Sequence, residues 1–382
     1  NLTKTFGSLR ALDDVTFTFP NGQVTCLLGP SGCGKTTLMR IIAGLEQQTE
    51  GEVFFGERNV SHLSPSKRDI GMVFQYPVVY RGISVYRNIE LPLQSMKMSK
   101  QERKQRVDAA VELMGLGPTA DQDVSKLDNG TRQKVSVARE VARQPEIILF
   151  DEPITNVDAN SKLQLKRSLK ELTRSLSQTI VYVTHDQTEA MTLGQRVAVL
   201  KDGVLQQVDT PTALYHRPRN LFVAAFIGSP TINLVEAELT DGALRFGALS
   251  IPVPAGADLG SRERVILGIR PSDLELAEFA DGGAPRIPAR LEVVENLGPE
   301  MHAIFPLDVP RVDADATRGA VDVEDAGDEQ LLADERALFT ASLAARAPLH
   351  PGQEVELAID SSRLLFFDAE SGETLAGAMA GS

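Results

Sequence analysis

The chain has 382 residues, of which 42% are hydrophobic and 24% charged, so it resembles a soluble globular protein with room for two or more domains. Its net charge of −13 argues against a general nucleic-acid-binding protein, which needs a basic face. The longest apolar runs have strand length and fall short of the roughly 18 residues of a membrane span. We therefore expect no nucleic-acid partner, and we expect any role at a membrane to depend on a partner protein.

Over the first 235 residues, short apolar runs alternate with segments of helical periodicity, which indicates a largely parallel α/β sheet. The expected strands are residues 15–20, 23–29, 51–57, 69–75, 146–153, 179–186 and 196–203. The expected helices are residues 35–45, stopped by Gly44, several within 77–143, and 161–176. Ser99 and Glu102 form a capping box at the start of one of the helices expected between residues 77 and 143.

From residue 236 to residue 382 the pattern changes to short β-like segments separated by Gly and Pro, which predicts a C-terminal all-β domain, a barrel or sandwich. The clearest strand-like segments are residues 263–271, 289–298, 354–360 and 363–370. Residues 308–335 are acidic and poor in aromatics, and we expect the first part of this stretch to be a long mobile loop. The sequence therefore predicts two domains, 1–235 and 236–382.

Residues 29–36 read G-x-x-x-x-G-K-T between an expected strand and an expected helix, which is the context of a phosphate-binding loop. Its backbone N–H groups and the helix N-terminus attract phosphate oxygens. We expect Lys35 to reach the β- and γ-phosphates, Thr36 to hold Mg²⁺, and Thr37 to touch the α-phosphate region. The predicted nucleotide-binding residues of this loop are Gly29, Ser31, Gly32, Cys33, Gly34, Lys35, Thr36 and Thr37. The alternative is a glycine-rich turn without a ligand.

Polar residues end three further expected strands. Asp151 can bind Mg²⁺, directly or through water, and the adjacent Glu152 can polarise an attacking water. His185 can sense the γ-phosphate and hold the geometry of base and water, and Gln75 can contact metal or water. The alternatives are an acidic helix cap at 151–152, a structural histidine, and an exposed glutamine at a strand end.

Together these motifs resemble the ATP-binding-cassette (ABC) ATPases of transporters over about residues 1–235. The resemblance implies an ATPase with ATP and Mg²⁺ as cofactors and a helical subdomain at about 77–143. It implies that Phe6 stacks on adenine, or else is a surface residue, and that 154–158, including Asp158, is the loop that links the two subunits' sites. In this family two ATP molecules lie between two head-to-tail cassettes.

Residues 268–271, 292–298 and 363–375 resemble the regulatory β-domain of ATPase subunits from bacterial sugar and polyol importers. That resemblance implies a peripheral protein at the cytoplasmic face of the inner membrane. The implied partners are a second ATPase subunit, two permease subunits and, indirectly, an external solute-binding protein. A permease helix is expected near Gln75 and the segment 76–88. Another ABC transporter type and a non-transport ABC protein are the alternatives.

One loop departs from the family's pattern. Where the family has Leu-Ser-Gly-Gly-Gln, this chain has Leu127-Asp128-Asn129-Gly130-Thr131. A carboxylate at 128 lacks the hydroxyl that would donate to a partner's γ-phosphate, and two like charges about 4 Å apart repel by about 4 kcal/mol at an effective dielectric of 20. We therefore hypothesise a heterodimer with a second, non-identical ATPase, as occurs in some glycerol importers, and glycerol is the first hypothesis for the cargo. The alternative is that Asp128 tilts away or binds Mg²⁺.

Cys33 lies at the N-terminus of a helix and beside Lys35, an environment expected to lower the pKa of its thiol. We therefore predict that alkylation of Cys33 abolishes ATP binding and that ATP protects it; the alternative is a spacer. Cys26 and Cys33 occupy adjoining parts of one strand–loop unit, so we expect no disulfide and a reducing compartment.

Overall fold

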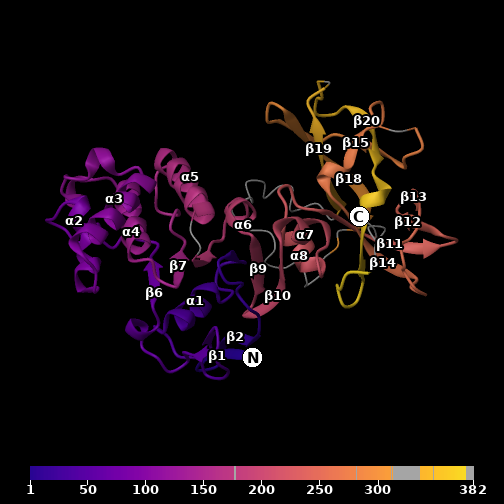
Figure 1. The fold of residues 1–382 in the computed structure, drawn as a ribbon. Coiled ribbons are helices and arrows are strands. Elements are labelled where there is room, and N and C mark those ends of the chain that lie inside the picture. The colour runs from indigo at the N-terminus through magenta and orange to yellow at the C-terminus, as the bar shows by residue number, and fades with distance from the viewer. Residues whose placement is uncertain (176–177, 281, 311, 313–335, 347, 376–382) are drawn as a thin grey trace. The chain divides into compact units, whose positions relative to one another are not determined.

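A computed structural model describes residues 1–175, 178–280, 282–310, 312, 336–346 and 348–375. The chain forms two compact units, an N-terminal unit, Asn1–Pro211, and a C-terminal unit, Thr212–Ser382 (Figure 1). The strands of the second unit start at Asn233, close to the change of sequence pattern. The domain boundary drawn from the sequence at 235/236 stays a prediction. Among the described residues, no helix combines the length and apolarity needed to cross a bilayer.

The N-terminal unit is built on a six-stranded sheet that is largely parallel, as the sequence pattern predicted. The strand order is β10-β9-β3-β8-β7-β6. All neighbouring pairs are parallel except β9–β10, which form an antiparallel hairpin. The bounds are β3 (Val24–Leu28), β6 (Ile70–Val73), β7 (Ile147–Asp151), β8 (Thr179–Val183), β9 (Arg196–Lys201) and β10 (Val204–Asp209). The strands β3 and β8 are buried along their whole length, which explains their continuous apolar runs.

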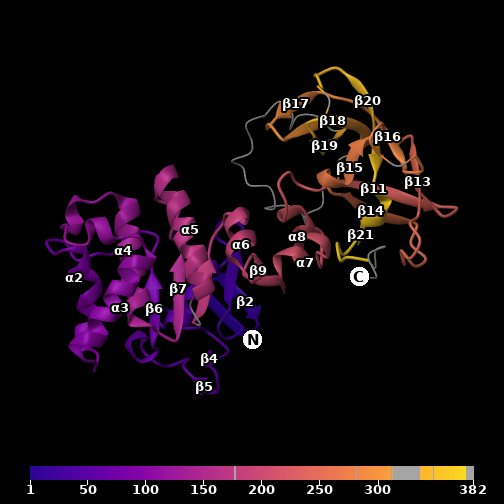
Figure 2. The same cartoon turned by 45° about the horizontal axis from the view of Figure 1, so that its top comes forward.

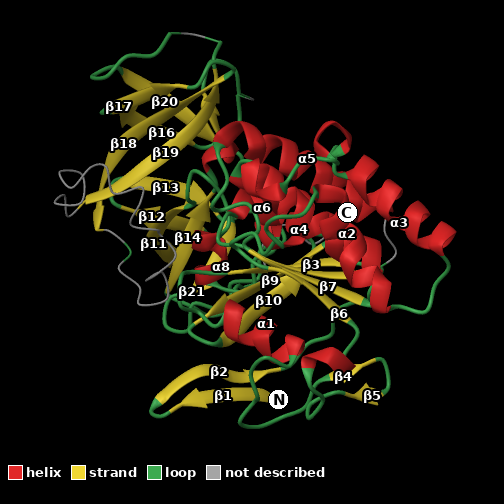
Figure 3. Ribbon diagram, turned by 90° about the vertical axis from the view of Figure 1, so that its left-hand side faces the viewer, coloured by secondary structure: helices red, strands yellow, loops and turns green. Residues whose placement is uncertain are grey.

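Helices cover both faces of this sheet. Figure 3 shows α1 (Lys35–Ala43) on one face, and α5 (Ala159–Ser175) and α6 (Gln187–Leu193) on the other. The helix α1 ends at Gly44, as predicted, because Gly44 adopts φ 75° and its N–H turns back to the carbonyls of Arg40 and Ile41.

The helical subdomain expected at 77–143 contains α2 (Val85–Glu90), α3 (Lys100–Leu113) and α4 (Asn129–Arg143). Both α2 and α3 pack against α4. The Ser99 hydroxyl accepts a hydrogen bond from the N–H of Glu102 at 3.1 Å, which confirms the N-cap expected there.

Two strand predictions were wrong. Residues 16–20 are not a strand: the strand there is β2 (Leu9–Val15), which pairs with β1 (Leu2–Phe6), a strand the sequence did not predict. The alternating Phe17 and Phe19 instead pack their rings against each other, 4.5 Å apart. Between 51 and 57 only β4 (Phe54–Phe55) is extended, because Gly56 turns the chain at φ 56° into β5 (Arg58–Asn59).

The C-terminal unit is largely β, as predicted, with strands in three sheets (Figure 2). The sheet orders are β13-β12-β11-β14-β21, β15-β20-β16 and β17-β18-β19. The strand bounds are β11 (Asn233–Thr240), β12 (Ala243–Phe246), β13 (Leu249–Pro252), β14 (Arg264–Ile269), β15 (Leu274–Leu276), β16 (Arg286–Arg290), β17 (Val293–Asn296), β18 (Glu300–Pro310), β19 (Arg336–Ala344), β20 (Glu354–Ile359) and β21 (Leu365–Asp368). Two short helices, α7 (Pro211–His216) and α8 (Leu221–Phe226), precede them.

The loop predicted from residue 308 is wrong for its first three residues. Residues 308–310 belong to β18, whose alternating buried side chains face the core. Residues 311 and 313–335, where the rest of that loop was predicted, lie outside the described residues.

Candidate active site

Four neighbouring strands of the parallel sheet end at one edge, and each is followed by predicted site residues. The glycine loop follows β3, His185 follows β8 by two residues, Asp151 ends β7, and Gln75 follows β6 by two residues. Since β3, β8, β7 and β6 are adjacent and parallel, these residues lie along the carboxyl edge of the sheet. The four motifs thus form a continuous row in space, in the order glycine loop, His185, Asp151 and Gln75.

The glycine loop needs glycine at two places because other backbone lies very close. A Cβ on Gly29 would lie 2.2 Å from the carbonyl oxygen of Leu200 in β9. A Cβ on Gly34 would lie 2.4 Å from the carbonyl oxygen of Ala11 in β2, and Gly34 also has φ 102°. The loop is therefore held between β9 and β2, with Ser31 and Gly32 exposed.

Lys35 begins α1 and is buried, with only 6% of its surface exposed. Its ammonium group donates to the carbonyls of Gly29 and Pro30, each at 2.8 Å. Thr36 and Thr37 follow in the first turn of α1 and are half-buried. The ammonium therefore lies on the loop that is predicted to hold phosphate.

Glu152 and His185 are brought together. Nδ1 of His185 lies 3.2 Å from Oε2 of Glu152. The N–H of Glu152 donates to the carbonyl of Val183 at 3.0 Å, so the end of β7 is tied to the end of β8. Thr155, which the sequence analysis did not single out, donates its hydroxyl to the same Oε2 at 3.3 Å. This arrangement can orient a carboxylate as a general base.

The carboxyl group of Asp151 has a raised pKa. Burial is the main cause and the charge of Glu152 adds to it, whereas Arg40 and Lys35 act in the opposite direction. A cation bound beside Asp151 would offset this unfavourable environment for the carboxylate. Among the described residues, no group of three or more His, Cys, Asp or Glu could hold a metal. One carboxylate with a hydroxyl and an amide oxygen still fits Mg²⁺, which binds through one or two carboxylates and phosphates.

The prediction for the thiol of Cys33 was wrong. Cys33 is 2% exposed and packs in the core cluster with Leu12. Burial raises the pKa of its thiol and outweighs the nearby Lys35, whose ammonium lies 3.6 Å from the sulfur. The predicted lowering of this pKa was therefore wrong, whereas the effect of alkylation on ATP binding stays a prediction.

In the altered loop, the side chain of Asp128 turns toward its own helix. It is the N-cap of α4, with Oδ1 accepting from the N–H of Thr131 and Oδ2 from the hydroxyl of Thr131, each at 2.8 Å. Asn129 is exposed, whereas Gly130 is buried. A Cβ on Gly130 would lie 2.4 Å from Cβ of Ser161, so glycine allows α4 to approach α5 closely.

Two other predicted nucleotide contacts have partners of their own. Phe6 ends β1 and is 46% exposed, and the ammonium of Lys4 lies 4.5 Å from its ring centroid. The carbonyl of Asp158 accepts from the N–H of Lys162 at 2.7 Å, and its carboxylate accepts from the N–H of Ser161 at 3.1 Å. Their proposed contacts with nucleotide remain predictions.

The helix α4 also holds the segment that follows β6, a connection that sequence reasoning missed. Gln133 is fully buried and donates to the carbonyl of Phe74 at 2.9 Å, and Arg139 donates to the carbonyl of Val78 at 2.8 Å. The signal available in the sequence was a set of polar residues among the apolar positions of α4, including Gln133 and Arg139. The helix that begins at Asp128 is thereby tied to both sides of Gln75.

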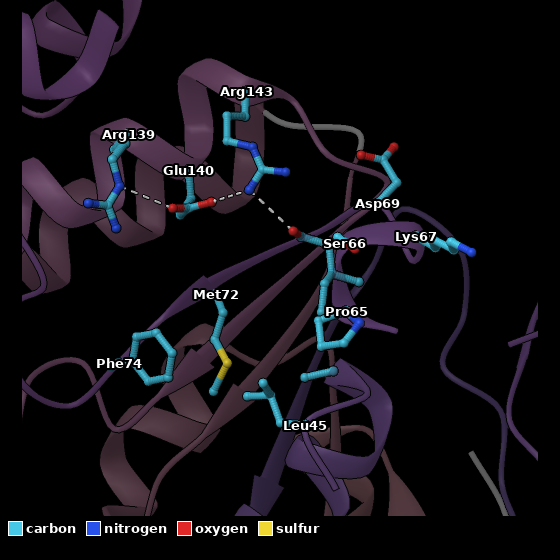
Figure 4. Close-up of a pocket in the computed structure, with 12 residues that line it drawn as sticks. Leu45, Pro65, Ser66, Lys67, Asp69, Met72, Phe74, Arg139, Glu140 and Arg143 are labelled. Carbon is cyan, nitrogen blue, oxygen red and sulfur yellow. Dashed lines mark hydrogen bonds and ion pairs between the residues drawn. The ribbon is translucent and has the colours of Figure 1, made fainter. Parts of the chain in front are cut away.

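A pocket of about 450 Å³ lies beside this connection (Figure 4). Glu140 lines the pocket and forms two ion pairs there, with Arg139 at 3.2 Å and with Arg143 at 2.8 Å. The residues that line the pocket are Ala43, Leu45, Pro65, Ser66, Lys67, Asp69, Ile70, Met72, Phe74, Arg139, Glu140 and Arg143. It combines apolar walls with fixed charges from α4.

Comparison with known proteins agrees with this architecture. Residues 12–155 match the ABC transporter family, and residues 233–276 match the CysA C-terminal regulatory domain. The structure of cbiO1 from Clostridium perfringens, part of the ABC transporter complex cbiONQ, is similar with a TM-score of 0.52 and 26% identity. The match covers 56% of this chain and 87% of cbiO1.

Relatives of similar length extend the likeness to nearly the whole chain. The trehalose import ATP-binding protein SugC of Mycobacterium tuberculosis is 39% identical over 96% of this chain and 94% of SugC. The sn-glycerol-3-phosphate import ATP-binding protein UgpC of Cereibacter sphaeroides is 37% identical over 98% of both chains. With this identity and coverage, the chain belongs to the ABC transporter family as an ATP-binding ATPase subunit.

Proposed function

We propose that this chain is the ATP-hydrolysing subunit of an importer that takes up a carbohydrate or polyol through a membrane permease. The observation that carries the ATPase mechanism is the pairing of Glu152 with His185, 3.2 Å apart, on strands beside the glycine loop. Import is supported by the relatives that carry import in their names. On this proposal the protein binds peripherally at the cytoplasmic face of the bacterial inner membrane.

The residues divide the chemistry between them. Glu152 accepts a proton from the attacking water, and His185 holds that carboxylate in place and contacts the γ-phosphate. When ATP binds, the ammonium of Lys35 exchanges its hydrogen bonds to the carbonyls of Gly29 and Pro30 for contacts with the phosphates. Thr36, Asp151 and Gln75 would hold Mg²⁺, which neutralises phosphate charge when bound.

The segment after β6 is proposed to meet the permease. Tyr76, Val78 and Tyr80 alternate as exposed apolar side chains, and the pocket of Figure 4 lies next to Phe74. An amphipathic permease helix that docks at this pocket could also cover the side chains of Tyr76, Val78 and Tyr80. Because Gln133 and Arg139 bond the same segment, a shift there would move α4 and the loop at Asp128.

A second, non-identical ATPase subunit is a further proposal, and it is carried by the lack of a hydroxyl at position 128. The N-cap geometry of Asp128 supports the opposite view, because both carboxylate oxygens are already bonded to Thr131. The rate of ATP hydrolysis by this chain assembled with the permease, with and without a second ATPase, decides between the two views. Low turnover from this chain alone, restored by a second ATPase, supports the heterodimer, whereas high turnover from this chain alone contradicts it.

Glycerol is our specific proposal for the cargo. Trehalose and glycerol phosphate stand in the names of relatives with nearly equal identity to this chain, so identity does not separate the cargoes. Uptake of labelled glycerol and of labelled trehalose by cells with and without this chain tests the choice. Loss of trehalose uptake alone would replace glycerol by a disaccharide.

The importer proposal itself is tested with Lys35→Ala. We expect this variant to lose Mg·ATP-dependent uptake while the folded protein still assembles with the permease. Arg58→Ala, in the small exposed hairpin β4–β5, serves as a matched control that removes a charge from the same unit. Uptake of every candidate solute at the wild-type rate by Lys35→Ala would refute the proposal.

A further inference from the structure

A buried carboxylate, Glu189, lies behind the turn that carries His185. Glu189 is in the first turn of α6 and only 5% exposed. Its Oε2 accepts hydrogen bonds from the hydroxyls of Tyr182 and Thr184, each at 3.0 Å. A buried polar group needs hydrogen-bond partners to offset the loss of its hydration. Glu189 has no role in the proposed hydrolysis, so its buried hydrogen bonds need another explanation.

The hydroxyl of Thr184 links Glu189 to the turn that carries His185. It donates to Glu189 and accepts from the N–H of Asp186 at 3.0 Å, so it serves as both donor and acceptor. The N–H of Thr184 donates to the carbonyl of Leu27 in β3 at 3.2 Å. The residues on both sides of His185 are thus fixed, and the imidazole projects from a closed turn toward Glu152.

Lys166 completes the network from α5. Its ammonium lies 3.3 Å from Oε1 of Glu189 and 3.5 Å from Oδ2 of Asp186. Asp186 in turn accepts from the N–H of Glu189 at 3.0 Å. Burial raises the pKa of Asp186, but the N–H of Glu189 and the charge of Lys166 outweigh it and leave that pKa below its ordinary value. Residues 154–158, the predicted intersubunit loop, directly precede α5.

We propose that Glu189 is a positioning residue for His185 and that it acts through the Thr184 hydroxyl to orient the imidazole toward Glu152. The ion pair between Lys166 and Glu189 links this orientation to α5. The inference rests on the role proposed above for His185. Glu189 itself touches neither nucleotide nor attacking water. Its loss therefore affects the rate of hydrolysis rather than the binding of nucleotide.

Kinetics of the full chain assembled with its permease test the proposal. In Glu189→Gln one oxygen remains to accept, but an NH₂ group replaces the other and the charge facing Lys166 is lost. We expect kcat to fall about tenfold and KM for ATP to stay within about twofold. Thr184→Val should act in the same direction, and it carries the test if Glu189→Gln does not fold. Lys170→Met, on the exposed side of α5, is the control and should change nothing.

A double variant and a spectroscopic readout separate positioning from general stability. Lys166→Met combined with Glu189→Gln should be no slower than Glu189→Gln alone, because both act through one network. The chain has five histidines, and His185→Ala identifies the imidazole resonance of His185 in the spectrum of the nucleotide-free chain. We expect Glu189→Gln to shift that resonance and leave those of the other histidines in place.

A folded Glu189→Gln variant with wild-type kcat and an unshifted His185 resonance, together with an inactive His185→Ala variant, would overturn this inference alone. Full activity of His185→Ala would overturn the proposed role of His185 and the inference with it.

Discussion

Asp128 replaces a hydroxyl expected in the family, and at the scale of the residue its structural role is clear. Its carboxylate binds both the N–H and the hydroxyl of Thr131, so it supplies the cap that the first turn of α4 needs. Burial raises the pKa of this carboxyl, but the bonds from Thr131 outweigh burial and leave the pKa below its ordinary value. Asp128 therefore serves this chain as the cap of α4.

The cap makes a prediction for stability and its pH dependence. Asp128→Ala should lower the stability of the N-terminal unit by about 1 kcal/mol, while Asp128→Asn, which keeps an acceptor, costs less. Because the folded pKa is lowered, the charge-dependent part is complete above about pH 4, the ordinary aspartate range, and is lost as pH falls through the folded value. Urea unfolding at pH 7 and pH 3 measures both. A gap between wild type and Asp128→Asn that widens at pH 3 would contradict the prediction.

Cys33 gives a second prediction at this scale. Since burial raises the pKa of the thiol, little thiolate exists at pH 7, and we expect alkylation of the folded chain to be at least about tenfold slower than that of a free thiol of ordinary pKa. Mass spectrometry after timed iodoacetamide treatment, with a urea-unfolded sample as control, gives the rate. Faster labelling in the folded chain than in urea would restore the original interpretation of Cys33 as a reactive thiol.

At the scale of the element, Arg68 joins α1 to the chain that leads into β6. Its guanidinium is 2% exposed and donates to the carbonyls of Ile41 and Ile42 at the end of α1, 2.7 and 2.9 Å away. The same group donates to the carbonyls of Ser61 and Leu63 at 3.1 and 2.9 Å. It therefore fixes the helix of the glycine loop against the segment before Gln75.

Removal of this guanidinium should be costly. Arg68→Met leaves several buried carbonyls without donors, and we expect a loss of roughly 3 kcal/mol in the stability of the N-terminal unit. Arg68→Lys should recover only part of the lost stability, because one ammonium cannot reach the same set of carbonyls. Urea unfolding followed by far-UV circular dichroism measures the change, with Arg58→Met in β5 as the exposed control. Equal stability of Arg68→Met and Arg58→Met would contradict this role.

The sequence predicted which strand ends lie together better than it predicted the segments around them, for physical reasons. The buried strands that lead to Gly29, Asp151 and His185 are recognisable in the sequence because both of their faces are covered. Adjacent parallel strands must then bring their ends together. The raised pKa of the Cys33 thiol could not be predicted, since its burial comes from a core cluster whose members are spread along the sequence. The strand β1 was missed because it is short and is defined by its pairing with β2. The strand β19 was also missed, although its side chains alternate between buried and partly buried positions.

At the scale of the whole molecule, two copies or two different chains must meet for the family's arrangement. If the chain pairs with itself, each predicted site contains one Asp128 facing the other copy's nucleotide. Asp128→Ser keeps an N-cap and removes the charge, so in a complex with this chain as sole ATPase it should raise kcat by about tenfold. Thr131→Ser, which keeps the hydroxyl that bonds Asp128, is the control. A fall in kcat for Asp128→Ser would contradict the view that the charge impairs the site.

The central claim is that this chain hydrolyses ATP with Glu152 as base at the edge of the parallel sheet. Hydrolysis by Glu152→Gln, in the complex with the permease, tests it most directly. The account predicts that ATP binding persists while kcat falls by about 10²- to 10⁴-fold. Hydrolysis by Glu152→Gln at the wild-type rate would contradict the account.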